Sequence, residues 1–345
     1  MRLSHPLIAA AFAIAVLGAL PALAQGTKGE APPPPAPPAA PAPALLPWLE
    51  NYEEAAKLAK EKNQLILTDL FSDKCGWCKK LEQDTFPAPE VQEVLKNFVL
   101  LKLNTGKAEF AKELLKKAGT TAVPATVITD ADWNLVRFIS GYMDSGPYAE
   151  KVRKGLTAHQ EFTALLPKVK DGTADYETTY NFLKACDELS RKAEIQAHGE
   201  KALAAVKGEH HADIAFFLSK TYEPGTPEFV KYKDLTLQLD PDNRFGHLDD
   251  FIMGDAIRIV YASKSKEETS ANLDKAIVIL EARLGQAAPA VNKEKGQAMY
   301  FMLYKLCNGK KDQAKAKEML KKGVEFGPDT TLGKHMAKIL GQLGG

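Results

Sequence analysis

The chain has 345 residues, which is enough for two domains in addition to an N-terminal leader. Lys and Arg together number 45 against 44 Asp and Glu, so the formal net charge is only +1. This balance gives no electrostatic reason to expect binding to nucleic acid or to an anionic membrane surface. Four cysteines are too few to build a disulfide-stapled scaffold.

The N-terminus has the three parts of a secretory signal peptide. A short basic start, Met1-Arg2, is followed by an apolar run from Leu7 to Leu20 and by Ala22-Leu23-Ala24. The apolar run is shorter than the ~20 residues of a membrane span. We therefore expect residues 1–24 to be removed after Ala24, which leaves no membrane span and places the protein in the periplasm or outside the cell.

Residues 25–47 are nearly all Pro, Ala and Gly. Such a segment cannot bury a core and favours polyproline II, so it is predicted to be a semi-extended tether. Export also affects the chemistry, because thiol pairs outside the cytoplasm meet disulfides as substrates.

The most informative motif is the Cys-x-x-Cys pair of Cys75 and Cys78. An apolar run from Gln64 to Phe71 precedes it and is predicted to be a buried strand, and a segment with helical spacing follows. A cysteine in the first turn of a helix lies beside unpaired N–H groups and the positive end of the helix dipole, which stabilise a thiolate. The neighbouring Lys74 adds a cation. Cys75 is therefore expected to attack disulfides, and Cys78 to attack the same sulfur and release the partner.

Two other interpretations of this motif remain. Half of a zinc site would need a second ligand pair at similarly short spacing, and none is present. Cys186 and Cys307 each stand alone in a helix-like segment and are predicted to be small buried apolar residues. His210-His211 is predicted to lie in a solvated loop, since adjacent residues point to different sides of a helix start. We expect no metal and no other cofactor; a purely structural disulfide is the remaining alternative.

From Trp48 to about Leu156, helical and strand patterns alternate. The predicted strands are Gln64 to Phe71, Phe98 to Leu103, Thr126 to Thr129 and Leu135 to Ile139. The predicted helices are Trp48 to Lys62, the segment after the cysteines to about Asp84, Glu90 to Asn97, Ala108 to Ala118 and Tyr148 to Leu156.

This region resembles the thioredoxin-like family. The residues at equivalent positions are Asp69, Cys75, Gly76, Cys78, Lys79, Lys102, Pro124 and Gly141. Over about a third of the chain, the pattern is most similar to exported proteins related to the periplasmic reductase module of the Dsb system. The resemblance implies an α/β fold with a central mixed sheet flanked by helices.

It also implies a cis peptide bond before Pro124 and a Val123 backbone that binds an incoming peptide as a short strand. Trp77 stands where thioredoxin has Pro, and we place it with these two residues in the expected substrate-binding surface.

Asp69 lies six residues before Cys75 in the predicted strand. A carboxylate buried beneath the thiols would have a raised pKa and could take the proton of Cys78. The resemblance makes Lys102 the partner of Asp69. The alternative is that Asp69 and Lys102 both lie at strand ends in water.

Residues 159–345 lack strand signals and are predicted to form an all-α, TPR-like repeat domain. The segment from Leu237 to Asn243 resembles the inter-repeat link of tetratricopeptide arrays. Such arrays offer a surface for partners, although a spacer or dimer role is the alternative. The predicted helices are Tyr176 to Lys192, Ala193 to Val206, Ala212 to Tyr222, Pro227 to Leu239, Leu248 to Ala262, Glu267 to Leu284, Lys293 to Cys307, Asp312 to Phe326 and Thr331 to Leu343.

The sequence thus predicts a thioredoxin-like domain at residues 48–158 followed by the helical domain at residues 159–345. We expect an exported thiol–disulfide oxidoreductase that acts on protein thiols and disulfides, together with an upstream redox partner protein. A reductase or isomerase direction is expected, and the choice between reductase, isomerase and oxidant stays open. The alternative is a non-catalytic scaffold or adaptor, in which the helical repeats bind a partner protein and the redox domain is vestigial.

Overall fold

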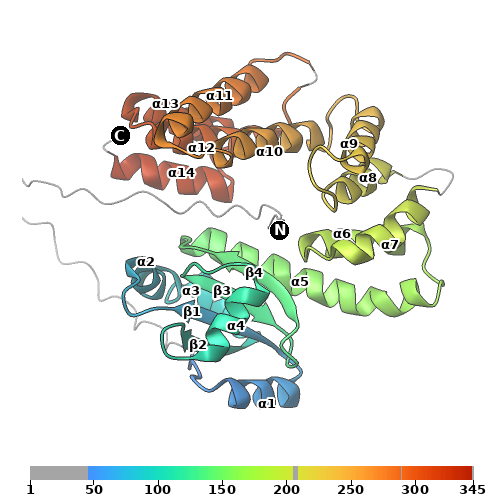
Figure 1. Ribbon diagram of the computed structural model, residues 1–345, viewed down its shortest axis with the longest axis vertical. Helices are drawn as coiled ribbons and strands as arrows, with labels where there is room; N and C mark the ends of the chain where they lie inside the picture. The colour runs from blue at the N-terminus through green and yellow to red at the C-terminus, as the bar shows by residue number, and fades with distance from the viewer. Residues whose placement is uncertain (1–45, 205–208, 289, 344–345) are drawn as a thin grey trace, which may run out of the picture. The chain divides into compact units, whose positions relative to one another are not determined.

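The computed structural model describes residues 46–204, 209–288 and 290–343 (Figure 1). The predicted signal peptide and the predicted tether up to residue 45 lie outside the described residues. The chain divides into two compact units, with the boundary between Arg153 and Lys154.

The first unit is built on a four-stranded mixed sheet in the order β2-β1-β3-β4. Strand β1 pairs with β2 in parallel, whereas the β1–β3 and β3–β4 pairs are antiparallel. All but the last residue of β1 are buried, which explains why this strand is mostly apolar on both faces rather than alternating, with Thr68 and Asp69 as its buried polar residues. The strands are β1 (Leu65–Phe71), β2 (Phe98–Asn104), β3 (Ala125–Thr129) and β4 (Leu135–Ser140).

The first unit also contains helices, and most of them begin and end within a few residues of the predicted bounds. They are α1 (Tyr52–Lys62), α2 (Gly76–Lys80), the π-helix η1 (Leu81–Thr85), α3 (Pro89–Leu95), α4 (Glu109–Lys117) and the start of α5 (Ser145–Lys170).

The predicted helical start at Trp48 is wrong. The side chain of Asn51 accepts a hydrogen bond from the backbone N–H of Glu54 at 2.9 Å, and this N-cap begins α1 at Tyr52. Leu49 instead forms a parallel bridge with Leu101 beside the edge strand β2. The residues before the cap therefore extend the sheet rather than the helix.

The helix that follows the cysteines widens after one turn. From Leu81 to Thr85 it is a π-helix, and the N–H of Phe86 donates to the carbonyl of Leu81 at 3.0 Å. At its end, the hydroxyl of Thr85 donates to the carbonyl of Met143 at 2.6 Å. This bond ties the helix to the loop that follows β4.

Helix α5 is much longer than predicted. The predicted helix from Tyr148 to Leu156 continues to Lys170, because no Gly or Pro lies between Leu156 and Pro167 to stop it. Pro167 itself lies inside the helix, near its end. In the first unit, the buried hydroxyl of Tyr148 bonds the hydroxyl of Thr126 at 3.0 Å. In the second unit, Phe162 stacks on Phe182 with ring centroids 5.4 Å apart. A cut between residues 158 and 159 would fall inside this helix.

The described residues of the second unit after α5 form nine helices and no strand. Each packs mainly against its neighbours in sequence, as in repeat arrays. The bounds lie within a few residues of the prediction, because Gly, Asp and Pro breaks mark them in the sequence. The helices are α6 (Tyr176–Glu188), α7 (Lys192–Leu203), α8 (His211–Ser219), α9 (Pro227–Leu239), α10 (His247–Tyr261), α11 (Lys266–Leu284), α12 (Lys293–Gly309), α13 (Gln313–Phe326) and α14 (Thr331–Gln342).

A buried ion pair links α10 and α11. The guanidinium Nε of Arg283 lies 2.7 Å from Oδ1 of Asp249, and both side chains are almost completely buried. The other oxygen of Asp249 accepts from the side chain of Asn243 at 2.7 Å and from the N–H of Asn292 at 2.8 Å. The carboxylate thus joins two helices to the loop that precedes α12.

Replacing Arg283→Met should destabilise the second unit strongly, because it leaves the buried charge of Asp249 uncompensated. The expected loss in free energy of unfolding is about 3 to 5 kcal/mol. The control is Lys322→Ala, which removes an exposed helix-surface ion pair with Glu318 and should leave the stability nearly unchanged. Urea unfolding followed by circular dichroism measures both; equal losses would contradict a structural role for the buried pair.

Candidate redox-active site

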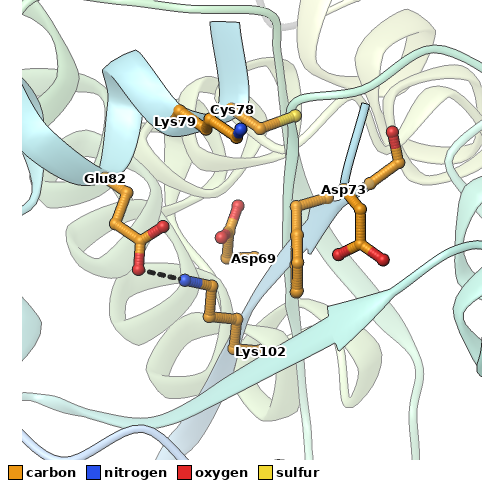
Figure 2. A pocket seen from close by; sticks show the side chains of 8 residues that line it. Asp69, Asp73, Cys78, Lys79, Glu82 and Lys102 are labelled. Atoms are coloured by element: carbon orange, nitrogen blue, oxygen red, sulfur yellow. Dashed lines mark hydrogen bonds and ion pairs between the residues drawn. The ribbon is translucent and has the colours of Figure 1, made fainter. Parts of the chain in front are cut away.

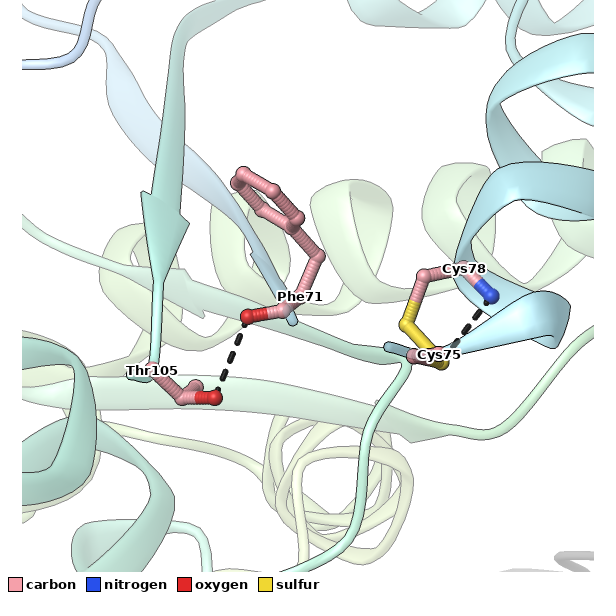
Figure 3. The surroundings of a disulfide bond; sticks show 4 residues. All are labelled: Phe71, Cys75, Cys78 and Thr105. Atoms are coloured by element: carbon pink, nitrogen blue, oxygen red, sulfur yellow. Dashed lines mark hydrogen bonds between the residues drawn. A yellow bond between two sulfur atoms is a disulfide. The ribbon is translucent and has the colours of Figure 1, made fainter. Parts of the chain in front are cut away.

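Cys75 and Cys78 form a disulfide at the start of α2 (Figure 3). Their sulfurs are 2.13 Å apart and their Cα atoms 5.3 Å apart. Cys75 is the N-cap residue of α2, with extended backbone angles, and its sulfur accepts a hydrogen bond from the N–H of Cys78 at 3.1 Å. The sulfur of Cys75 therefore lies at the positive end of the helix, where the helix N–H groups stabilise negative charge.

The two cysteines differ in exposure. Cys75 is partly exposed, whereas Cys78, one turn into the helix, is only 6% exposed. Gly76 and Trp77, between them, are exposed. A disulfide partner from solvent can thus reach Cys75 more easily than Cys78.

The end of β1 is held beside this turn. The N–H of Thr105 donates to the carbonyl of Phe71 at 2.8 Å. The hydroxyl of Thr105 donates to the same carbonyl at 3.1 Å (Figure 3). The N–H of Cys75 donates to the carbonyl of Ser72 at 3.1 Å, which closes the turn into α2. These bonds fix where the chain leaves the sheet and enters the cysteine turn.

A cavity of about 320 Å³ lies beneath Cys78 (Figure 2). Figure 2 shows the carboxyl group of Asp69 pointing from β1 toward the helix that carries Cys78. The cavity thus brings a titratable group to the inner cysteine. Its lining residues are Asp69, Phe71, Ser72, Asp73, Cys78, Lys79, Glu82 and Lys102.

Asp69 is 3% exposed, and its Oδ1 has no hydrogen-bond partner among the described residues. Burial raises the pKa of Asp69 to about 7, because a low-dielectric surrounding disfavours the charged carboxylate. The positive charge of Lys102 lowers this pKa, and the negative charge of Glu82 raises it. A carboxyl group with a pKa near neutrality can both accept and return a proton.

Lys102 acts through its charge on Asp69, the partner predicted for it. The two residues face each other in the β1–β2 register, but the ammonium of Lys102 forms its ion pair with Glu82. Figure 2 shows this pair beside Asp69. Glu82 was missed from the sequence, although its position four residues after Cys78 places both side chains on one face of a helix.

The peptide bond between Val123 and Pro124 is cis, as predicted. Ala125 pairs with Leu70 in the β1–β3 register. Val123 and Pro124, which precede Ala125, therefore lie near the end of β1, where the cysteine turn begins. The carbonyl of Pro124 accepts from the N–H of Gly141 at 2.9 Å. Sheet register therefore brings this loop, the loop after β4 and the cysteine turn to the same end of the sheet.

The remaining sequence candidates lie in the second unit. His210 is not in a solvated loop: it precedes α8 and its ring stacks on Tyr180 with centroids 3.6 Å apart. Cys186 and Cys307 are buried free thiols, as predicted, and burial raises the pKa of both.

Within the described ranges, no group of three or more His, Cys, Asp or Glu side chains is arranged to hold a metal ion. Over the same ranges, no helix is long and apolar enough to cross a membrane.

Comparison with known proteins agrees with this geometry. Residues 52–169, which include both cysteines and all four strands, match the family model of a thioredoxin-like domain. The first unit is therefore a thioredoxin-like domain, as the sequence predicted.

Two curated relatives are thiol:disulfide interchange proteins named DsbD. The protein from Cronobacter sakazakii is 33% identical over 102 residues, which cover 29% of this chain and 18% of that protein. The protein from Haemophilus influenzae is 28% identical over 110 residues, which cover 31% and 19%. The chain thus spans less than a fifth of the length of the curated relatives it matches.

Among solved structures, the oxidised C-terminal domain of Neisseria meningitidis DsbD is similar at 20% identity and a TM-score of 0.26. The match covers 30% of this chain and 90% of that domain. A protein described as DsbH oxidoreductase gives 20% identity and a TM-score of 0.30, covering 34% and 88%.

The raised pKa of Asp69 predicts a pH-dependent stability. The folded protein keeps a proton on Asp69 that the unfolded chain releases above its usual pKa of 3.8, so the stabilisation is complete below about pH 4 and is lost as pH rises through about 7. Between about pH 5 and pH 8.5 the loss should be on the order of 2 to 3 kcal/mol.

The Asp69→Asn variant should lack this part of the pH dependence, whereas Asp73→Asn, an exposed carboxylate at the same cavity, should keep it. Urea unfolding of the oxidised proteins at a series of pH values measures the slopes. If Asp69→Asn and wild type lose stability in parallel, Asp69 does not titrate in this range.

Proposed function

We propose that the chain is an exported thiol–disulfide oxidoreductase whose redox centre is the Cys75–Cys78 pair. The observation that carries the proposal is the asymmetry of the pair. One sulfur caps a helix and is partly exposed, and the other is covered and faces a cavity that contains a carboxyl group of raised pKa. Such an arrangement suits one attacking thiol and one resolving thiol.

In the reductase direction, the thiolate of Cys75 attacks one sulfur of a substrate disulfide. The substrate S–S bond breaks, a mixed disulfide forms, and the first substrate thiolate leaves and takes up a proton. Asp69 then accepts the proton of Cys78, whose thiolate attacks the sulfur of Cys75. The second substrate thiolate leaves, and two electrons have passed from the protein dithiol to the substrate.

In the isomerase direction the first step is the same, but a second cysteine of the substrate attacks the mixed disulfide before Cys78 does. The substrate then leaves with a rearranged disulfide, and Cys75 and Cys78 stay reduced. Which direction prevails depends on how strongly the fold stabilises the thiolate of Cys75.

Substrate polypeptide should bind along the loop of Val123 and Pro124, which precedes β3, and against the side chain of Trp77. An extended segment can pair with the Val123 backbone as a short strand, which would hold its cystine against Cys75. The relatives named as thiol:disulfide interchange proteins support protein thiols and disulfides as the substrate class. An upstream redox partner protein would return electrons to the Cys75–Cys78 disulfide.

We further propose that the redox domain and the helical domain are separate functional parts, and that the helical domain recruits or orients substrate. Its helices pack in sequence order, as in arrays that present a surface to partners. In this proposal the redox domain comprises residues 48–158 and the helical domain residues 159–345, and the continuous helix α5 runs from one into the other. Export after Ala24 and a tether at residues 25–47 complete the proposed organisation.

The alternative is an adaptor in which the helical array binds a partner and the redox domain is vestigial. Its support is the size of the second unit, which holds more than half of the chain. Insulin reduction by the full chain with a dithiol reductant separates the two functions. Turnover above the uncatalysed rate supports the oxidoreductase, and no turnover in this assay or in refolding of a scrambled disulfide protein supports the adaptor.

The proposed roles of the cysteines predict opposite behaviour of two single variants. Cys78→Ser keeps the attacking thiol but cannot release its partner, so it should accumulate mixed disulfides with substrate proteins. Cys75→Ser keeps only the covered thiol and should trap none. Non-reducing electrophoresis after incubation with a disulfide-containing protein measures the trapped species.

Cys186→Ser, in an otherwise unchanged chain, is the control for buried thiols and should behave as wild type. Equal trapping by the Cys75→Ser and Cys78→Ser variants would contradict the assignment.

A further inference from the structure

The loop after β4, residues 141–144, forms hydrogen bonds with two other segments of the first unit. The N–H of Gly141 donates to the carbonyl of Pro124, and the carbonyl of Met143 accepts from Thr85 at the end of η1. Gly141 has φ +74°, a left-handed conformation that suits glycine and lets the chain bend as it leaves β4. The loop is therefore bonded both to the Val123–Pro124 loop and to the helical segment that follows the cysteines.

Tyr142 is the central side chain of this loop. Its ring lies 5.4 Å from the ring of Trp77, tilted by 38°, and its hydroxyl donates to Asp144 at 2.7 Å. Burial and this bond to Asp144 raise the pKa of the phenol, so the side chain is neutral at physiological pH. The ammonium of Lys80 lies 5.4 Å from the centre of the same ring and also pairs with Asp84 at 2.8 Å. Tyr142 thus has a fixed position.

Trp77 remains 45% exposed even though Tyr142 covers part of its ring. Trp77 follows Cys75 by two residues and lies in the first turn of α2. Two polar groups beside the rings have partners in the structure, since Lys80 is paired with Asp84 and the phenol of Tyr142 donates to Asp144. The exposed surface that Trp77 and Tyr142 present to an incoming chain is therefore largely aromatic.

We propose that Tyr142 and Trp77 form a specificity wall that selects substrates with an apolar or aromatic residue beside the cystine under attack. This inference rests on the proposed function and adds the substrate class. The occupant is an extended polypeptide segment, because the N–H of Gly141, the neighbour of Tyr142, is bonded to the carbonyl of Pro124 in the loop proposed to bind substrate backbone. Tyr142 sets the preference by adding its own ring to the wall and by holding the indole of Trp77 in place.

The test uses two peptides that are identical except for Phe or Ser next to their one cysteine, each supplied as a disulfide-linked dimer. Reduced full-length protein converts a dimer to two thiol peptides and is itself oxidised to the Cys75–Cys78 disulfide. The readout is the ratio of second-order rate constants for the Phe and Ser dimers, measured by chromatography of the released peptides. Wild type should prefer Phe, and Tyr142→Ala should lower the ratio roughly three- to tenfold, the range expected for one aromatic pair.

Two further variants distinguish a change in substrate preference from a general loss of activity. Tyr142→Phe keeps the ring and loses the bond to Asp144, so it should retain most of the preference. Tyr261→Ala removes an aromatic ring that is 75% exposed on α10 and should leave the ratio unchanged. A loosened site would slow both dimers equally and leave the ratio as in wild type.

The inference is overturned if wild type reduces both dimers without preference, if Tyr142→Ala keeps the ratio, or if Tyr142→Phe loses it. If wild type reduces neither dimer, the proposed oxidoreductase function fails as well. The two failures are therefore distinguishable.

Discussion

The position of Cys75 as the N-cap of α2 is the constraint on which the rest of the site depends. It places one sulfur where helix N–H groups stabilise a thiolate, and the helical turn that follows then places Cys78 inside the protein. The strand that leads into this turn carries Asp69, whose carboxyl group lies beneath the inner cysteine. The groups to which we assign the attacking thiol, the resolving thiol and the proton acceptor thus all lie on one strand–turn–helix connection. In the proposed function their different surroundings give the three groups different roles.

Most of the fold could be predicted because its signals are local. The buried strands read as apolar runs, and Gly, Asp and Pro mark the ends of the helices from α6 to α14. The errors arose where a weak local signal was overlooked or was absent. The Asn51 cap moves the start of α1, and Leu49 is recruited by the sheet instead. The end of α5 was predicted at the point where strand signals stop, yet nothing in the chain there stops a helix.

The site was predictable to the extent that it depends on spacing and on the family resemblance, as for Cys75, Cys78 and the cis bond before Pro124. Pairings between elements were not. Register places Lys102 opposite Asp69, but the long lysine side chain reaches Glu82, which leaves Asp69 with a pKa set mainly by burial. Tyr142 carries no motif of its own, and only the folded loop after β4 brings it to Trp77.

The most direct test of the central claim is to map which cysteine of the reduced, folded protein reacts with a limiting amount of iodoacetamide. Peptide mass spectrometry assigns the label to each of the four cysteines. The account predicts that Cys75 carries almost all of it, because its sulfur is accessible and lies at the helix N-terminus, whereas Cys78 and the two buried thiols are covered. Equal labelling of Cys75 and Cys78, or preferential labelling of Cys78, would contradict the division into attacking and resolving thiols.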